Sequence, residues 1–350
     1  MPPSIEKPPY EAILVVSFGG PEHRDHVIPF LENVLRGRNV PRERMLEVAE
    51  HYYHFGGVSP INAQNRALIE ALKAELPRHG VDLPVYFGNR NWHPLLPDTL
   101  AEMRAAGVRR ALAYFTSAFS SYSGCRQYRE NILAAQEQVG DGAPAVDKIR
   151  VFYNHPGFVE AMADRVREAL EQIPAERRAA ARLIYTAHSI PNSMAANCAY
   201  EQQLRESSRL VTEAVGRTDF IIAYQSRSGP PTQPWLEPDV GDVIKQLHGE
   251  GVGDVVVVPI GFVSDHMEVI YDLDDEAKHL AEGLGVNMVR AGTVGTHPRF
   301  VRMIAELIVE RIQGKVERPA LGVLGPCHDV CPIDCCLPPP RPPMPARPAN

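Results

Sequence analysis

Eight short β-branched runs, separated by segments with helical periodicity, constrain the fold of this chain most strongly. The runs are Ala12–Ser17, Pro84–Gly88, Arg110–Phe115, Ile149–Tyr153, Arg182–Thr186, Phe220–Tyr224, Val255–Ile260 and Met288–Ala291. Most are nearly continuous apolar segments, as expected of parallel strands that are covered on both faces. Helical patterns separate them at Asn62–Leu76, Gly157–Ala175, Gln202–Val215, Asp239–His248 and Asp265–Gly283. This alternation predicts parallel α/β sheets with right-handed crossovers.

The runs form two groups of four, and a chain of 350 residues is long enough for two domains. We therefore predict an α/β fold of two Rossmann-like domains, each a four-stranded parallel sheet flanked by helices. The domains are expected at residues 8–155 and 156–297, with a last helix at 298–313 that packs on the first. A cysteine-rich segment at 316–337 and a Pro-rich tail at 338–350 follow. Because the tail cannot form a packed core, we expect it to be disordered.

Composition excludes several classes of protein. With 44% hydrophobic and 23% charged residues the chain is typical of a soluble globular protein, and it has no apolar run of the roughly 18 residues that a membrane span needs. Its N-terminus lacks the basic and apolar regions of a secretory signal, so we expect a cytoplasmic enzyme. A net charge of −7 argues against nucleic-acid binding.

The segments that follow the predicted strands carry the functional information, because ligands of open parallel sheets bind at the carboxyl ends of the strands. These ends are rich in Gly, Ser, His and acidic residues, and read SFGGP, GNRNWHP, TSAFSSYSGC, YNHPG, TAHSIP, YQSRSGP, GFVSDHMEV and GTVGTHP. No G-x-G-x-x-G or G-x-x-x-x-G-K-[ST] motif follows any of them. Nucleotide binding therefore loses its main support.

His188 directly follows the run ARLIYTA (181–187), which contains one of the predicted strands. Position alone fits a histidine that hydrogen-bonds a loop equally well. Ser189 can cap the following turn and Pro191 restricts the backbone, so the imidazole is expected to be held in place. A fixed imidazole at a strand end can accept a proton near neutral pH or bind a metal ion.

Three carboxylates have the spacing of one helical row. If a helix begins at Ser264 or Asp265, then Glu268, Asp272 and Glu276 lie at i, i+4 and i+8. A solvated acidic face is the commoner origin of such a pattern. The competing interpretation is a path for a hard divalent cation, because like charges in a row are mutually unfavourable without one.

Six segments together resemble the ferrochelatase family. They are SFGGP (17–21), GGVSPI (56–61), TAHSIP (186–191), YQSRSGP (224–230), PIGFVSDHMEVIYDLD (259–274) and NMVRAGTVG (287–295). The resemblance covers residues 11 to 313, and TAHSIP with FVSDHMEV is its most specific part. It implies two chelatase-type domains with a porphyrin cleft between them. It also implies a lyase of haem biosynthesis that inserts Fe²⁺ into a porphyrin and releases two protons.

The resemblance implies a role for each matched position. His188 falls on the family's metal-side histidine, Glu268 on the opposing glutamate, and Asp272 with Glu276 on the outer acidic row. Both His188 and Glu268 are thus implied to meet the substrate iron. Which of the two accepts protons and which delivers iron is left open. The fit is chemically sound, because metal insertion needs a base near the operating pH and carboxylates that strip water from the cation.

Porphyrin contacts are implied for Ser59 and for Tyr128, with Tyr122 as the competitor of Tyr128. Arg36 and Arg38 fall where basic residues meet propionates, although a solvated basic loop explains them equally well. One further position departs from the family: Phe18 stands where some bacterial relatives have an iron-ligating tyrosine. Phenylalanine cannot coordinate iron, so His188 is the first candidate for any axial ligand in the product.

The chain has six cysteines, of which four, Cys327, Cys331, Cys335 and Cys336, lie close together. That density favours a soft-metal site or an iron–sulfur cluster. Some ferrochelatases hold a [2Fe–2S] cluster with three C-terminal cysteines and one internal cysteine, which implies the ligands Cys125, Cys327, Cys331 and Cys336. Cys335 is a close alternative to Cys336, and a zinc site or free thiols are alternatives to the cluster. The sixth, Cys198, falls in a predicted helix and is expected to be a small core residue.

The segment between Pro21 and Gly56 bears on the choice of porphyrin, because membrane-associated family members have a longer apolar lip there. Here it is short and charged, which favours coproporphyrin III over protoporphyrin IX. The cysteine-bearing tail is also similar to that of actinobacterial coproporphyrin III ferrochelatases. The expected partners are this porphyrin, Fe²⁺ and, transiently, other haem-pathway enzymes. The alternatives are a cobalt or nickel chelatase of the same fold and a non-catalytic porphyrin or haem carrier.

Overall fold

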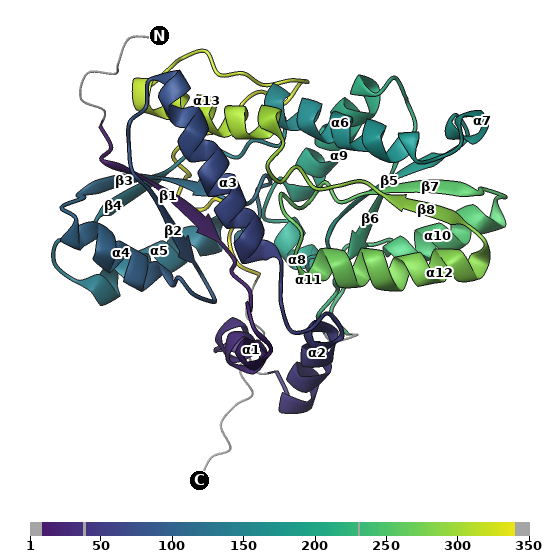
Figure 1. The fold of residues 1–350 in the computed structure, drawn as a ribbon, viewed down its shortest axis with the longest axis horizontal. Helices are drawn as coiled ribbons and strands as arrows, with labels where there is room; N and C mark the ends of the chain where they lie inside the picture. The colour runs from purple at the N-terminus through teal and green to yellow at the C-terminus, as the bar shows by residue number, and fades with distance from the viewer. Residues whose placement is uncertain (1–8, 38–39, 230–231, 340–350) are drawn as a thin grey trace.

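Two parallel four-stranded sheets form the centre of the protein, as a computed structural model that describes residues 9–37, 40–229 and 232–339 shows (Figure 1). Their strand orders are β2-β1-β3-β4 and β6-β5-β7-β8. The strands are β1 Ala12–Ser17, β2 Val85–Asn89, β3 Arg110–Phe115, β4 Ala145–Lys148, β5 Arg182–His188, β6 Ile221–Gln225, β7 Asp254–Val258 and β8 Asn287–Arg290. The predicted α/β class with two parallel sheets is confirmed.

The fourth strand was predicted at the wrong place. The structure has it at Ala145–Lys148, paired in parallel with β3 from Arg110 to Ala113, and not at Ile149–Tyr153. The predicted segment is a connector that passes through the core shared by the two sheets, where Phe152 and Tyr153 are only 1% exposed. Its apolar character therefore reflects burial and not strand pairing.

Helices cover both faces of each sheet. The α-helices are α1 Val27–Leu35, α2 Arg42–His54, α3 Ile61–Glu75, α4 Leu96–Ala105, α5 Gln127–Val139, α6 Pro156–Glu171, α7 Ala175–Arg178, α8 Asn192–Ala195, α9 Tyr200–Ala214, α10 Val240–Gly249, α11 Met267–Val269, α12 Lys278–Leu284 and α13 Pro298–Gln313. Helices α4 and α5 cover one face of the first sheet, and α10 and α12 cover the corresponding face of the second (Figure 1). The last helix, α13, packs on α3 and α6, and a single apolar core joins these helices to the other faces of both sheets.

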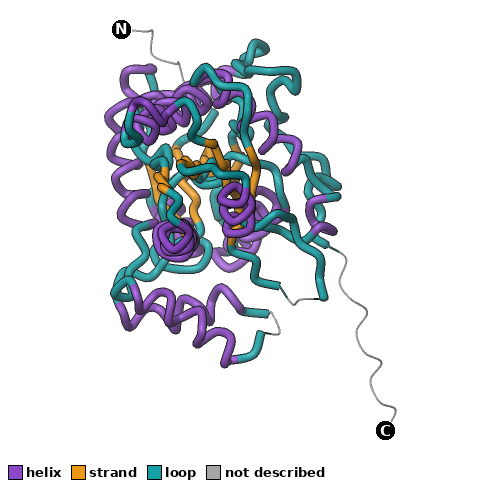
Figure 2. The backbone as a smooth tube through the Cα atoms, turned by 90° about the vertical axis from the view of Figure 1, so that its right-hand side faces the viewer, coloured by secondary structure: helices purple, strands orange, loops and turns teal. Residues whose placement is uncertain are grey.

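Helices α1 and α2 lie outside this body, below the region where the two halves meet in Figure 1 and apart from the sheets in Figure 2. They pack on each other and on Trp92 through a small core that includes Phe30 and Met45. The outer surface of α2 is polar, and this helix reaches the second half, where the ring of His51 stacks on that of Tyr271 at 3.8 Å. Among the described residues, no helix is long and apolar enough to cross a membrane.

The single helix predicted over Asp265–Gly283 is three shorter pieces. Helix α11 begins after His266, whose Nδ1 accepts a hydrogen bond from the backbone N–H of Glu268 at 3.2 Å. The cap is therefore neither Ser264 nor Asp265. Residues Ile270–Ala277 then form a π-helix, η4, before α12 continues as an ordinary α-helix. Turns of π-helix are rare and often mark functional sites, and this one carries Asp272 and Glu276.

Residues after α13 run back across the first half without forming a helix or strand over 314–339. Buried Arg150 attaches them, since its Nε bonds Glu310 of α13 at 2.7 Å and its Nη2 donates to the carbonyl of Pro319 at 2.8 Å. The Asn154 side chain donates to the carbonyl of Gly325 at 2.9 Å. Most of the predicted Pro-rich tail, 340–350, lies outside the described residues.

Candidate active site

His188 is the last residue of β5 and is held from two sides. Its Nδ1 contacts the carbonyl oxygen of Ser189, and its own carbonyl oxygen accepts a hydrogen bond from the Tyr200 hydroxyl at 3.0 Å. Its Nε2 lies 3.4 Å from Oε1 of Glu268. When Nδ1 carries the proton for Ser189, the lone pair of the neutral ring is on Nε2. The structure therefore brings the two residues singled out by the sequence into direct contact.

The ionisation of this pair is set by two opposing effects. Burial disfavours the imidazolium of His188, but the charge of Glu268 and the hydrogen bonds to Glu268 and Ser189 outweigh it and raise the pKa of His188 to about 9. Burial likewise works against the carboxylate of Glu268, and the charge of His188 overcomes it, so that the pKa of Glu268 is lowered. At neutral pH the two side chains form an ion pair.

Asp272 lies one step further along the row. Burial is the main cause of its raised pKa of about 7; a hydrogen bond from Ser226 opposes the shift, and the charges of Glu268 and Glu276 add to it. Ser226 has φ of 62°, a backbone conformation that costs a non-glycine residue of the order of 1 kcal/mol. Gln225, the last residue of β6, contacts the Glu268 carbonyl and lies 3.5 Å from Oδ2 of Asp272. Asp272 is thus a carboxyl group that changes charge near neutral pH.

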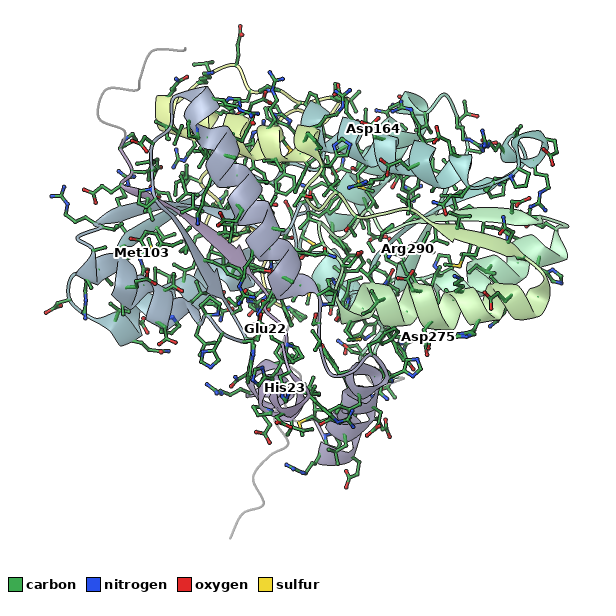
Figure 3. All side chains as sticks on the ribbon, in the orientation of Figure 1. Glu22, His23, Met103, Asp164, Asp275 and Arg290 are labelled. Carbon is green, nitrogen blue, oxygen red and sulfur yellow. The ribbon has the colours of Figure 1, made fainter. Side chains whose placement is uncertain are left out.

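The acidic row reaches the surface at Glu276, whose side chain is exposed and hydrogen-bonds Tyr271. Beside it is a cavity of about 480 Å³ between α2 and η4, lined by Arg24, Glu50, His51, Tyr53, His54, Tyr271 and Asp275. Oδ1 of Asp275 is 3.6 Å from Nε2 of His54, and Figure 3 shows Asp275 at the edge that faces α2. A larger cavity, about 950 Å³, lies against α13 and residues 315–320, away from His188.

The ferrochelatase family model matches residues 10–312, most of the chain. This chain belongs to the ferrochelatase family. The resemblance given by the strand-end motifs is thereby confirmed, and the protein is a metal chelatase, a lyase.

Relatives agree on the family and differ on the porphyrin in their names. A ferrochelatase of Rhodopirellula baltica is 61% identical over 97% of this chain and 96% of its own length. Coproporphyrin III ferrochelatases of Streptomyces coelicolor and Nocardia farcinica are 50% and 51% identical over 99% and 95% of this chain, and over 98% of each relative. The relative with the higher identity is thus not one named for coproporphyrin III.

Two solved structures of SirB from Bacillus subtilis, one with Fe³⁺ and one, a sirohydrochlorin chelatase, with cobalt, are similar to this chain. Their TM-scores are 0.54 and 0.53, at 14% and 12% identity; they cover 85% and 87% of this chain, and 94% and 95% of their own. At this identity the likeness concerns the fold alone.

The residues that are predicted to contact the porphyrin differ widely in how accessible they are to a ligand. Tyr128 is 5% exposed and packs on Phe115 and under the Arg90 guanidinium, so little of its surface is left for a ligand. Tyr122 begins a short π-helix, η3 Tyr122–Arg126, and its hydroxyl donates to Glu130 at 3.0 Å. It is the more accessible of the two tyrosines.

Ser59 is 4% exposed and packs against Gly20, where its backbone N–H donates to the Pro21 carbonyl at 2.8 Å. Phe18 meets Phe30 edge to face, with ring centroids 6.2 Å apart. Arg36 is exposed at the end of α1, and Arg38 lies outside the described residues. Ser59 and Phe18 thus both lie at the loop that follows β1, whereas Arg36 directly follows α1.

Sequence reasoning missed several side chains of the enzyme's site. Gln225 and Ser226 lie in YQSRSGP, which was recognised as a strand end, but nothing in the motif shows that they turn toward Asp272. Partly buried Tyr52 of α2 has a raised pKa, first through burial and then through the charges of Glu268 and Asp272. No sequence signal ties α2 to the acidic row, because the two are more than two hundred positions apart.

The cysteines expected at a metal cluster do gather in one place. Cys125 of η3 hydrogen-bonds Cys331, and Sγ of Cys335 lies 3.6 Å from Sγ of Cys336. Cys327 lies close enough to feel the charges of Cys331 and Cys335. Cys198 is in a bend before α9 and not in a helix, so that part of the prediction was wrong.

The surroundings of these thiols suit a negatively charged metal centre. The hydrogen bond from Cys125 lowers the pKa of Cys331, burial opposes this, and the charges of Lys148 and Arg129 add to it. Arg126 also donates to the carbonyl of Cys335 at 3.1 Å. Four neighbouring thiols with basic groups beside them fit a [2Fe–2S] cluster, whose iron would displace the protons that Cys125, Cys327 and Cys336 keep without it. The donors of His328, Cys331 and Cys335 lie within 4.8 Å of one another, which also fits a zinc ion.

Proposed function

We propose that this ferrochelatase inserts Fe²⁺ into coproporphyrin III between its two halves, with His188 and Glu268 at the point of insertion. The observation that carries the proposal is the 3.4 Å contact between Nε2 of His188 and Oε1 of Glu268, at the inner end of the carboxylate row that continues through Asp272 to exposed Glu276. Carboxylates are suitable ligands for a ferrous ion that must be stripped of water.

Iron in this proposal travels along η4. Exposed Glu276 offers the first carboxylate, and Asp272 and Glu268 replace water ligands further in. A cation on Glu268 competes with the imidazolium for the same carboxylate. The pKa of His188, which Glu268 holds at about 9, therefore falls when iron arrives.

When iron replaces the imidazolium at Glu268, His188 also becomes able to act as a base. Insertion releases two pyrrole protons, and a neutral His188 presents its lone pair on Nε2 because Ser189 accepts from Nδ1. Asp272, with a pKa of about 7, is the second group that can take up a proton near neutral pH. We assign the first proton to His188 and its transfer toward solvent to Asp272.

Coproporphyrin III is preferred over protoporphyrin IX for two reasons. Several relatives of about 50% identity carry the name coproporphyrin III ferrochelatase. Helices α1 and α2, which form the lip beside the site, keep Phe30, Met45 and Trp92 inside their own small core and expose charged residues such as Arg42 and Glu43. A lip of this kind suits a polar tetracarboxylate that arrives from water.

The test is anaerobic incubation with Fe²⁺ and either porphyrin, followed by visible absorption. We expect metallation of coproporphyrin III with kcat/KM at least tenfold above that for protoporphyrin IX. A reversed ratio would assign protoporphyrin IX instead. Binding of both porphyrins without metallation would indicate a carrier, and turnover with Co²⁺ or Ni²⁺ but not Fe²⁺ would indicate a different chelatase.

We further propose that Cys125, Cys327, Cys331 and Cys336 hold a [2Fe–2S] cluster, which supplies a redox-active group remote from the chelation residues. Cys125 and Cys336 are 3% and 4% exposed, so two of the four ligands are shielded from solvent. Half-exposed Cys335 remains the alternative to Cys336. In this arrangement the cluster fastens the residues after α13 to η3 of the first half.

Replacing Cys331 with serine tests this assignment, with Cys198→Ser as the matched control. We expect the first variant to lose the visible absorption and the acid-labile sulfide of the cluster, and the control to keep both. Bound zinc in the wild-type protein, measured by elemental analysis and without labile sulfide, would favour the site of His328, Cys331 and Cys335.

A further inference from the structure

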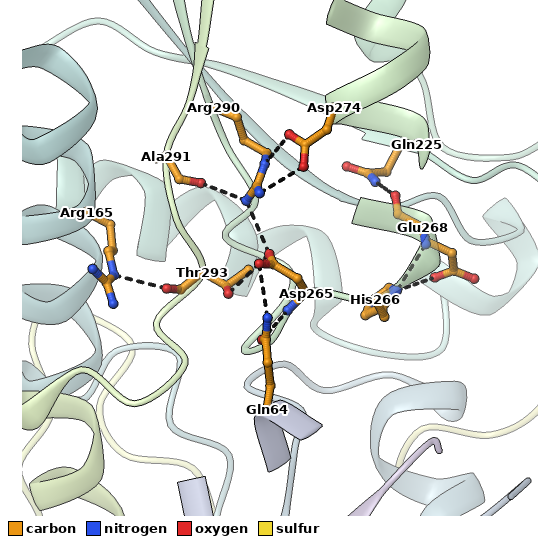
Figure 4. A network of polar contacts seen from close by, with 10 residues as sticks. All are labelled: Gln64, Arg165, Gln225, Asp265, His266, Glu268, Asp274, Arg290, Ala291 and Thr293. Atoms are coloured by element: carbon orange, nitrogen blue, oxygen red, sulfur yellow. Dashed lines mark hydrogen bonds and ion pairs between the residues drawn. The ribbon is translucent and has the colours of Figure 1, made fainter. Parts of the chain in front are cut away.

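The loop that precedes Glu268 is hydrogen-bonded to the other half of the molecule through a polar side chain. Gln64, on the first turn of α3, meets Asp265 at two points: its Nε2 donates to Oδ2 at 3.2 Å, and its Oε1 accepts from the backbone N–H at 2.8 Å. Figure 4 shows both bonds. They join the two sequence halves three residues before Glu268.

The far side of Asp265 is fixed within the second half. Its Oδ1 accepts from Nη1 of Arg290, the last residue of β8, at 3.2 Å and from Oγ1 of Thr293 at 3.3 Å. The same guanidinium also binds Asp274 of η4, because its Nη2 donates to Oδ2 at a distance of 2.9 Å. Arg290 therefore holds the loop before α11 and the π-helix after it in a fixed relation (Figure 4).

We propose that Gln64 is a positioning residue, whose two-point bond to Asp265 sets the distance between the first half and the Glu268 carboxylate. Residues 261–266 form neither helix nor strand, so their place depends on contacts of this kind. Gln64 follows Ser59 by five positions on the first half, and His266, the cap of α11, follows Asp265 directly. The bond thus connects the expected porphyrin wall to the start of the helix that presents Glu268.

This inference rests on the proposed function, and it concerns how far the iron-side carboxylate stands from the porphyrin. Loss of the bond lets this loop, together with the Arg290 contacts that fix it within the second half, shift relative to the first half while both half-sites stay folded. A shift of about 1 Å in a reacting group costs up to a hundredfold in rate. Binding of the porphyrin to the first half depends much less on this loop.

The first experiment measures Fe²⁺ insertion by Gln64→Leu, with Gln246→Leu on the exposed face of α10 as the matched control. We expect kcat to fall at least tenfold, KM for Fe²⁺ to rise, and KM for the porphyrin to change less than threefold. The control should match the wild type. An unchanged kcat, or a loss that appears only in porphyrin KM, would overturn the proposal. Failure of the wild type to metallate any porphyrin would instead refute the proposed function.

A second experiment exchanges the donor at Gln64 with the acceptor at Asp265, and so distinguishes a positioning role from general structural damage. In Gln64→Glu two carboxylates face each other, and in Asp265→Asn two amide groups do. The double variant restores one donor opposite one acceptor at the same formal charge, while the asparagine Oδ1 still accepts from Arg290. We expect each single variant to lose about tenfold in kcat and the pair to recover to within threefold of wild type. If the double variant is as slow as the product of the single losses, the two side chains do not act through each other.

Discussion

The two halves of the molecule share one strand order and differ in what stands at the strand ends. Ser17 ends β1 opposite Asn89, and His188 ends β5 opposite Gln225, so the two residues hold equivalent places. Ser17 accepts hydrogen bonds from Asn65 at 2.8 Å and Thr116 at 3.0 Å. All of these partners are uncharged.

In the second half, the equivalent place is titratable. His188 meets Glu268 at 3.4 Å, and both groups have strongly shifted pKa values. Under the proposed function, the two halves share a scaffold, but only the second half carries the groups for proton and metal chemistry. The uncharged end of β1 can face a flat porphyrin ring without competing for the cation.

Among the variants that test this difference between the two halves, His188→Ala is expected to have the largest effect. Removing the proposed proton acceptor should lower kcat about a thousandfold, within the usual range of about 10²–10⁴ for a general base. Porphyrin affinity, followed by fluorescence quenching, should change little. Turnover near the wild-type level would place the proton acceptor elsewhere and break the comparison.

A smaller effect is expected for Asp272→Asn, and it depends on pH. Burial raises the pKa of Asp272 to about 7, so the carboxylate form that takes up iron or a proton is populated above that value and lost below it. Wild-type kcat/KM for Fe²⁺ should therefore rise with pH through about 7. The variant should lack this rise and lie about tenfold below wild type at pH 8, with a smaller deficit at pH 6. An unchanged pH profile would remove Asp272 from the path.

The smallest effect on rate is expected for Ser17→Ala, the counterpart of the first variant. Its hydroxyl is fully buried, and its loss leaves Asn65 and Thr116 without an acceptor. The free energy of unfolding should fall by about 1–3 kcal/mol in denaturant titration. The kcat of the folded protein should stay within threefold of wild type. A hundredfold loss would show that the first half contributes chemistry as well.

The sequence was sufficient for the sheets and for the central pair of the site. Continuous apolar runs located seven of the eight strands to within two residues at each end, because strands covered on both faces need such runs. His188 and Glu268 were singled out because they lie at or after the carboxyl ends of strands, where ligands of parallel sheets bind, and because their motifs resemble those of the family. The fourth strand was misplaced because Ile149–Tyr153 is apolar for a different reason, burial between the two halves.

The remainder depends on contacts between distant residues. A spacing of four residues fits a row on an α-helix. No local pattern showed that Ile270–Ala277 would form a π-helix instead, or that Arg290 would bind it through Asp274. The bond of Gln64 to Asp265 joins positions 201 apart. Tyr128 was a candidate from its place in the chain, and only packing against Phe115 reveals how little of it is accessible.

The attachment of the last residues to the first half has a consequence for synthesis on the ribosome. Helix α13 covers α3, buried Arg150 is paired only when Glu310 is present, and Cys125 meets Cys331. The first half therefore leaves the ribosome with an uncovered apolar face and an unpaired Arg150, and must wait for about the last seventh of the chain. The first half therefore cannot fold by itself during translation, as domains in chains of this length commonly do. Nascent chains stalled before residue 298 should be the ones that recruit chaperones.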